Sequence, residues 1–148
     1  MDAWVGLLGA IAAAVIALMG QHLTRRSESL ERETSLLLEQ CARLVALADD
    51  YRNRVWEERH SLATDQVGRW DLIECLPAEA RARLLCRSEA VLQALEDMRV
   101  AGVDLGKAWR FRNADEIALD QAWTAYTATI RRFTSVAADH LRHRARSR

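Results

Sequence analysis

Residues that interrupt helices are scarce in this sequence: its 148 residues include one proline, Pro77, and six glycines. Strands in β proteins are short and are separated by frequent Gly, Pro, Asn and Asp turns, which this chain lacks. Long uninterrupted stretches with apolar residues at helical spacing take their place. We therefore expect an all-α protein.

Signatures of catalysis and metal binding are also missing. The three cysteines, an odd number without a CxxC pair, indicate no disulfide framework, and we expect them to be small buried side chains. Glu57 and His60 have the E-x-x-H spacing of di-iron bundles, but such sites need a second E-x-x-H and two further glutamates. Phosphate-loop, dinucleotide-binding, zinc-protease and serine-hydrolase patterns are absent. We expect no enzyme activity, no cofactor and no metal.

The longest apolar stretch runs from Ala3 to Gly20 and carries no charge. As a helix it covers about 27 Å, close to the hydrocarbon thickness of a bilayer. A cleaved signal peptide would begin with basic residues, whereas the only charged side chain before this stretch is Asp2; a buried core helix is the other alternative. We predict a single-pass anchor over residues 1–22. Arg25 and Arg26 follow it, which predicts an outside N-terminus and a cytoplasmic C-terminal domain.

Small residues gather on one face of this predicted membrane helix, while Trp4, Leu8 and Ile11 fall on nearly the opposite face. A small-residue face lets a second helix approach closely, which favours self-association in the membrane. The small residues follow a spacing of +4, +3, +4, +3: they are Gly6, Ala10, Ala13, Ala17 and Gly20.

Three bundle helices are expected after the anchor, over about residues 23–61, 77–101 and 114–141, forming one helical domain over residues 23–141. Apolar positions seven residues apart mark the first helix, and this seam could pack against another copy or against the same chain. Its members are Leu30, Thr34, Leu37, Cys41, Leu44, Ala48, Tyr51 and Val55. The third helix has the clearest apolar stripe, made of Leu119, Trp123, Tyr126, Ile130, Phe133, Ala137 and Leu141.

Proline, glycine and N-capping residues set the predicted boundaries of the second and third helices. Pro77 suits the first turn of the second helix, and Gly102 and Gly106 are expected to bracket its end. Asn113 and Glu116 have the N-x-x-E spacing of a cap for the third helix.

Two basic groups are candidate contacts for polyanions. In a loop after the second helix, Lys107, Arg110 and Arg112 alternate with aromatic residues, a combination that suits bases or lipid headgroups. The alternative is that Trp109 and Phe111 close the bundle core. If three helices alternate in direction, the loop returns toward the anchor and the C-terminus ends far from it. A basic tail over residues 142–148 could contact nucleic acid by charge alone, through Arg142, Arg144, Arg146 and Arg148.

The layout resembles a known family in several short patches. These are the uncharged N-terminal stretch, Thr24-Arg25-Arg26, the segment Tyr51-Arg52-Asn53-Arg54-Val55-Trp56, and the closing helix Ala122–Leu141. The chain is similar in these patches to KilB-like small membrane proteins of mycelial actinomycetes, which are named for a plasmid spread protein. The resemblance implies an accessory role in the spread of a conjugative plasmid or mobile element. It implies no catalytic residue.

The sequence therefore predicts a membrane-anchored helical scaffold or interaction protein that forms a homo-oligomer, with its protein partner undefined. One alternative is a membrane protein that tethers nucleic acid through its Arg-rich C-terminus. Another is a phage-type envelope or lysis accessory protein with the bundle outside the cytoplasm.

Overall fold

All regular structure described for this chain is helical. The computed structural model describes residues 2–61, 65–70 and 72–146, with side chains from residue 28 onward except that of Leu72. Its elements are α1 (Asp2–His60), the short 3-10 helix η1 (Leu72–Glu74), α2 (Cys75–Leu85), α3 (Glu89–Arg110) and α4 (Glu116–Arg146). No strand occurs among these residues, which confirms the all-α prediction.

The chain divides into two compact units, Met1–Ser35 and Leu36–Arg148, and α1 contributes to both. Over the part of the chain that could be searched, no helix has the length and apolarity that membrane crossing requires. The side chains of the predicted anchor, residues 3–20, lie outside the described ones, as do those of its small-residue face. The anchor therefore stays a prediction.

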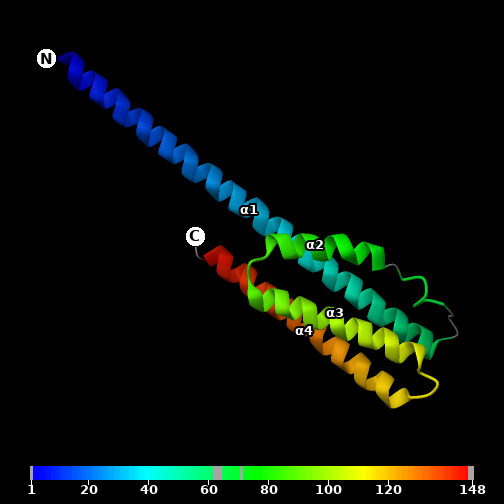
Figure 1. Cartoon of the computed structure of the whole chain (residues 1–148). Helices are drawn as coiled ribbons and strands as arrows, with labels where there is room; N and C mark the ends of the chain where they lie inside the picture. The colour runs from blue at the N-terminus through cyan, green and yellow to red at the C-terminus, as the bar shows by residue number, and fades with distance from the viewer. Residues whose placement is uncertain (1, 62–64, 71, 147–148) are drawn as a thin grey trace. The chain divides into compact units, whose positions relative to one another are not determined.

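Within the unit Leu36–Arg148, successive helices alternate in direction, and α3 and α4 form an antiparallel hairpin (Figure 1). The prediction of one helix over residues 77–101 is wrong, because α2 and α3 are separate helices. Cys86 and Ser88 both have extended backbone, with φ/ψ of −97°/125° and −81°/113°. Ser88 is a residue type that favours the N-cap, and Glu89 follows it with the negative charge that suits a first turn.

With this additional helix, the two basic groups lie at opposite ends of a four-helix bundle (Figure 1). The turn between α3 and α4 lies at the end of the bundle where α1 ends, and the C-terminus of α4 lies at the opposite end (Figure 1). The ion pairs of Arg59, near the end of α1, agree with the position of the α3–α4 turn. Arg59 pairs with Glu116 at 2.7 Å and also with Asp120, and both carboxylates lie in the first turns of α4. Within the unit Leu36–Arg148, the turn before α4 therefore lies beside the end of α1, and the C-terminus of α4 lies at the opposite end of the bundle (Figure 1).

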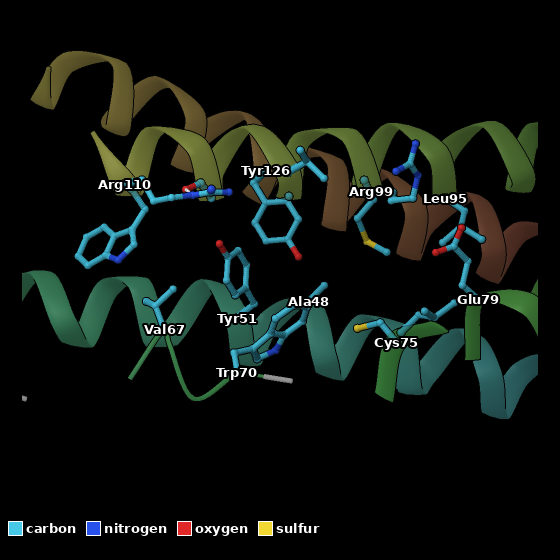
Figure 2. A pocket seen from close by; sticks show the side chains of 16 residues that line it. Ala48, Tyr51, Val67, Trp70, Cys75, Glu79, Leu95, Arg99, Arg110 and Tyr126 are labelled. Carbon is cyan, nitrogen blue, oxygen red and sulfur yellow. Dashed lines mark hydrogen bonds between the residues drawn. The ribbon is translucent and has the colours of Figure 1, made fainter. Parts of the chain in front are cut away.

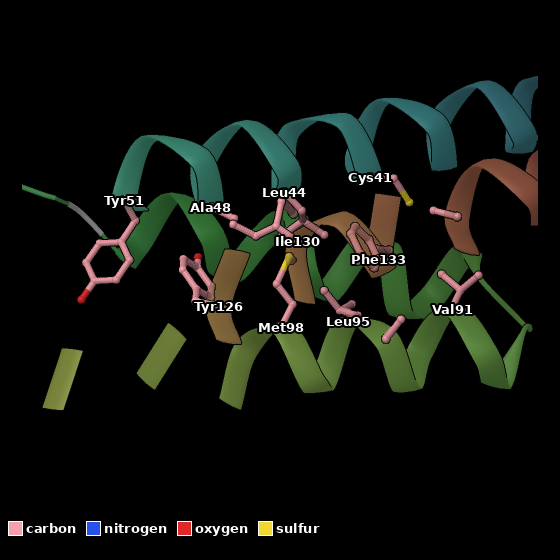
Figure 3. Close-up of a cluster of buried hydrophobic side chains, with 14 of the residues drawn as sticks. Cys41, Leu44, Ala48, Tyr51, Val91, Leu95, Met98, Tyr126, Ile130 and Phe133 are labelled. Atoms are coloured by element: carbon pink, nitrogen blue, oxygen red, sulfur yellow. The ribbon is translucent and has the colours of Figure 1, made fainter. Parts of the chain in front are cut away.

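The core is a single cluster that joins α1, α2, α3 and α4 (Figure 3). The seam of α1 is confirmed from Leu37 onward, whereas Leu30 is exposed and the hydroxyl of Thr34 donates to the Leu30 carbonyl. The seam therefore packs within one chain. Six of its eight positions are buried, together with most of the α4 stripe: Leu37, Cys41, Leu44, Ala48, Tyr51, Val55, Leu119, Tyr126, Ile130, Phe133 and Ala137.

Gly102 and Gly106 do not bracket the end of a helix but lie inside α3, which continues to Arg110. Both glycines are required by close packing. A Cβ at Gly102 would come within 3.1 Å of the Tyr126 ring, and one at Gly106 within 2.9 Å of the Tyr51 hydroxyl. The helix tolerates two glycines, at roughly 1 kcal/mol each, because these two tyrosines fill the space that a side chain would occupy.

Both ends of α4 also differ from the prediction. Asp115, rather than Asn113, caps its start, since the Asp115 carboxylate accepts a hydrogen bond of 2.9 Å from the Ala118 amide. The segment predicted as a basic tail over residues 142–148 is helical as far as Arg146. Arg142 anchors the extra turn by pairing with Asp139 at 2.6 Å.

Candidate functional site

The predicted polyanion-binding residues after the second helix do not lie in one loop. Lys107 and Arg110 belong to the last turn of α3, and Arg112 follows in the turn before α4. Lys107 pairs with Asp104 at 3.2 Å. Arg112 covers the Trp109 ring, with its guanidinium carbon 3.9 Å from the ring centroid, and lies 3.9 Å from a Glu58 carboxylate oxygen. Only Arg110, among these three cations, has no carboxylate partner in the described part of the chain.

The expectation that Trp109 and Phe111 close the core holds for the first residue alone. Trp109 is buried, whereas 70 % of Phe111 is exposed. The aromatic residues therefore do not alternate with cations on one surface, as a stacking platform for bases would require.

The predicted contacts near the C-terminus lie along the last turns of α4. Arg142, Arg144 and Arg146 are within the helix, and Arg148 lies outside the described residues. The structure does not bring this group near Arg110, because α3 and α4 are antiparallel and the two groups lie at opposite ends of the bundle (Figure 1).

A pocket of about 380 Å³ opens on the side of the bundle (Figure 2). It lies between α1 and α3, and α2 covers only one end of it. Beside it, α3 and α4 pack closely, with Cα atoms within 8 Å of each other. Its lining is mostly apolar and aromatic and consists of Leu44, Ala48, Tyr51, Val67, Trp70, Cys75, Glu79, Leu95, Met98, Arg99, Gly102, Val103, Gly106, Trp109, Arg110 and Tyr126.

Three aromatic rings form the centre of this pocket. The Tyr51 ring lies 4.6 Å from the Trp70 ring, with a tilt of 47°, and 6.1 Å from the Tyr126 ring in an edge-on arrangement. These rings come from α1, from the segment before α2 and from α4, so the site exists only in the folded bundle. Rings at these distances attract one another by about 0.5–1.5 kcal/mol beyond the area they bury.

Trp70 is carried by a segment that runs back along α1. Residues 65–70 are held there by two hydrogen bonds: the Val67 amide donates to the Glu58 carboxylate at 2.9 Å, and the Arg54 guanidinium donates to the Gln66 carbonyl at 3.2 Å. These contacts keep Val67 and Trp70 over the gap that α2 leaves uncovered. The wall they form depends on side-chain contacts rather than on regular structure.

The opposite end of the pocket is closed by a chain of ion pairs between α2 and α3. Arg83 lies 2.8 Å from Glu79 and 2.7 Å from Glu96, and Arg99 also pairs with Glu96. Hydrogen bonds from Arg99 and Arg83 lower the pKa of the Glu96 carboxyl to about 2. Glu79 and Arg99 both line the pocket, and each is already engaged in this network.

The remaining polar groups of the pocket are hydrogen-bond donors. The Trp70 indole nitrogen is buried and has no hydrogen-bond partner among the described residues, and the Tyr51 and Tyr126 hydroxyls belong to the same lining. Burial raises the pKa of both tyrosines, so their hydroxyls stay protonated at neutral pH. Arg110 adds a guanidinium at the rim, where its Nε donates to the Gly106 carbonyl at 3.3 Å.

Sequence reasoning missed this pocket, although it singled out Tyr51 and Tyr126 as core positions and Arg110 as a cation. The missing signal was Trp70, which lies in a segment without helical periodicity. In the described part of the chain, no group of three or more Cys, His, Asp and Glu side chains is placed to hold a metal ion. Comparison with protein-family models, curated proteins and solved structures finds no match to this chain.

Proposed function

We propose that this protein is a helical scaffold, anchored in the membrane by residues 3–20, that self-associates through the outer face of α2. The observation that carries the proposal is the orientation of α2. This helix fully buries only the small side chains Ala78 and Ala82, and it turns Leu76 and Leu84 outward, while Leu85 packs partly against the core. An interaction surface, rather than a catalytic site, is what such a helix provides.

The outer face of α2, together with η1, forms an apolar stripe. Ile73 is 72 % exposed, Leu76 56 % and Leu84 85 %. Leu76, Ala80 and Leu84 are spaced four residues apart, which aligns them along one side of the helix. Aligned apolar side chains at the surface favour burial against another protein, with each large side chain contributing about 1.5–3 kcal/mol when fully covered.

A second copy of the same chain fits this stripe. Antiparallel pairing of two α2 helices about Ala80 would bring Leu76 and Leu84 of the two copies together. The small Ala80 side chain at the centre lets the helices approach closely, and a two-fold interface of this kind closes on itself as a dimer.

The anchor completes the proposal. The uncharged residues 3–20 belong to the same helix, α1, whose later residues enter the bundle core. We infer that Gly6, Ala10, Ala13, Ala17 and Gly20 pack between copies in the membrane, where small residues allow close helix contact. The resemblance to KilB-like membrane proteins supports a role in the spread of a conjugative plasmid, with the bundle in the cytoplasm.

The oligomeric state of an α2 variant tests self-association. In Leu76→Gln/Leu84→Gln, both changes are at exposed positions, so we expect the bundle to fold. The variant is made in a chain that also carries Ala10→Leu/Ala13→Leu, which disrupts the proposed membrane interface, and we expect its molar mass measured by light scattering in detergent to fall from that of the Ala10→Leu/Ala13→Leu chain toward that of a monomer. Leu38→Gln is the matched control, since Leu38 is 54 % exposed on α1 and lies outside the stripe. An unchanged mass in the α2 variant would refute the interface.

Membrane attachment is tested separately on the full chain in cells. We expect the uncleaved chain to pellet with membranes and to resist extraction by alkaline carbonate, because an apolar helix in the bilayer does not depend on ionic contacts. Recovery of the uncleaved chain in the supernatant would exclude the anchor. The α2 interface would remain testable in that event.

A further inference from the structure

The polar groups that line the pocket beside α3 include more hydrogen-bond donors than acceptors that are free to bind a ligand. The indole N–H of Trp70 is buried and has no acceptor among the described residues, and the protonated hydroxyls of Tyr51 and Tyr126 in the pocket lining can also donate. The carboxylate that lines the pocket, Glu79, already accepts hydrogen bonds from Arg83. A buried donor without an acceptor costs about 1–3 kcal/mol, so this arrangement favours a ligand that brings oxygen acceptors.

The positive charge at the rim of the pocket also favours a ligand with oxygen acceptors. Among the described residues Arg110 has no carboxylate partner, in contrast to Arg99, which is held by Glu96 in the same pocket wall. Arg110 lies near Tyr51, and its positive charge opposes the rise in the Tyr51 pKa. In Figure 2 the Arg110 side chain extends along the pocket toward Tyr126. An anionic group at this rim would meet a guanidinium that can bind a carboxylate through two parallel hydrogen bonds.

The size and shape of the pocket limit the rest of the ligand. Its volume of about 380 Å³ is at the small end of the range for ligand sites. The edge-on Tyr51 and Tyr126 rings and the tilted Trp70 ring offer aromatic surface to a flat apolar body. The absence of side chains at Gly102 and Gly106 lets Tyr126 and Tyr51 lie close against α3.

We propose that this pocket binds a small aromatic carboxylic acid, with its ring system among Tyr51, Tyr126 and Trp70 and its carboxylate on Arg110. The pocket lies on the inner side of α2, away from the outer stripe. Ligand binding and self-association are therefore independent proposals.

Calorimetric titration of the full chain with 2-naphthoate tests this site, with protein-free solution of the same detergent and buffer as the blank. We expect saturable binding of one naphthoate per chain. The neutral isostere 2-naphthamide is expected to bind at least tenfold more weakly, because it cannot form the charge-assisted pair with Arg110. Absence of saturable naphthoate binding, or equal affinity for the amide, would overturn the proposal without any variant.

Three variants locate the site. Arg110→Gln is expected to weaken naphthoate binding about tenfold while leaving the affinity for naphthamide unchanged. Val103→Trp places a large ring at a half-exposed position of the pocket wall and is expected to abolish binding of both probes. Arg81→Gln removes an exposed arginine of α2 outside the pocket and is the matched control. An Arg110→Gln protein that binds naphthoate as tightly as the unmodified chain would refute the role of Arg110.

Discussion

Gly106 on α3 leaves room for the hydroxyl of Tyr51 on α1: a Cβ at Gly106 would lie 2.9 Å from that oxygen. This contact explains why a glycine is tolerated inside a helix, where alanine is favoured by about 0.5–1 kcal/mol. The relationship between the two residues can be measured, because either partner can be changed alone.

In a Tyr51→Phe background, where the hydroxyl is absent, Gly106→Ala is expected to stabilise the bundle by about 0.5–1 kcal/mol. With Tyr51 present, the same change is expected to give no gain in stability or a loss. The free energy of unfolding in urea, measured for the four proteins of the cycle, gives the coupling between the two positions. A matched cycle of Gly102→Ala with Tyr51→Phe is expected to show little coupling, since the Cβ at Gly102 would meet Tyr126 instead. Equal effects of Gly106→Ala in both backgrounds would contradict the packing.

Asp115→Ala is expected to cost about 0.5–2 kcal/mol of stability, because it removes the hydrogen bond that satisfies the Ala118 amide at the start of α4. Asn113→Ala serves as the comparison and is expected to have an effect near zero. Urea unfolding distinguishes the two caps. A larger loss from the Asn113 variant would show that the cap is two residues earlier than described.

The stability of the bundle is expected to fall in acid as Glu96 is protonated. The folded pKa of about 2 lies below the ordinary value of 4.5, so the contribution of Glu96 is complete above about pH 4.5 and is lost as the pH falls toward 2. Glu96→Gln is expected to lower the Tm at pH 7 and to flatten its decline between pH 5 and pH 2. Glu57→Gln, an exposed carboxylate of α1, is the control. If the Tm of Glu96→Gln declined between pH 5 and pH 2 as steeply as that of the unmodified chain, this role of Glu96 would be excluded.

The thiols are expected to differ in their rates of modification. Burial raises the pKa of Cys41 to about 11, and Cys86 is buried as well, whereas Cys75 is partly exposed. With a colourimetric disulfide reagent at pH 8, we expect one fast reaction, at Cys75, and two slow ones; urea makes all three fast. Cys75→Ser is expected to remove the fast phase alone. A fast reaction of Cys41 in the native protein would contradict the core.

The helices with strong periodicity were predictable, and the connections were not. The seam from Leu37 to Val55 and the α4 stripe are visible because each buries a repeating face against large partners. Helix α2 has no such face, since only Ala78 and Ala82 are buried, and its apolar residues therefore appeared to continue into α3. The signal that was overlooked is Ser88 followed by Glu89.

The pocket was beyond sequence reasoning for a different reason. Trp70 reaches Tyr51 through a segment held by individual hydrogen bonds to Glu58 and Arg54, and such contacts leave no periodic pattern. The two glycines of α3 were interpreted as helix-ending residues because their tyrosine partners are distant in the chain. Arg110 was recognised as a cation, but its lack of a carboxylate partner depends on the tertiary structure.

From Leu37 to Val55, the seam of α1 is occupied by its own chain. A second copy could pack against that face only if the two chains exchanged a whole helix. Both cores would have to unfold for this exchange. The proposed assembly through the exterior stripe of α2 would avoid this barrier, because subunits that are already folded could join and separate. Two differently labelled populations would then exchange partners at the rate of dissociation, far faster than unfolding permits.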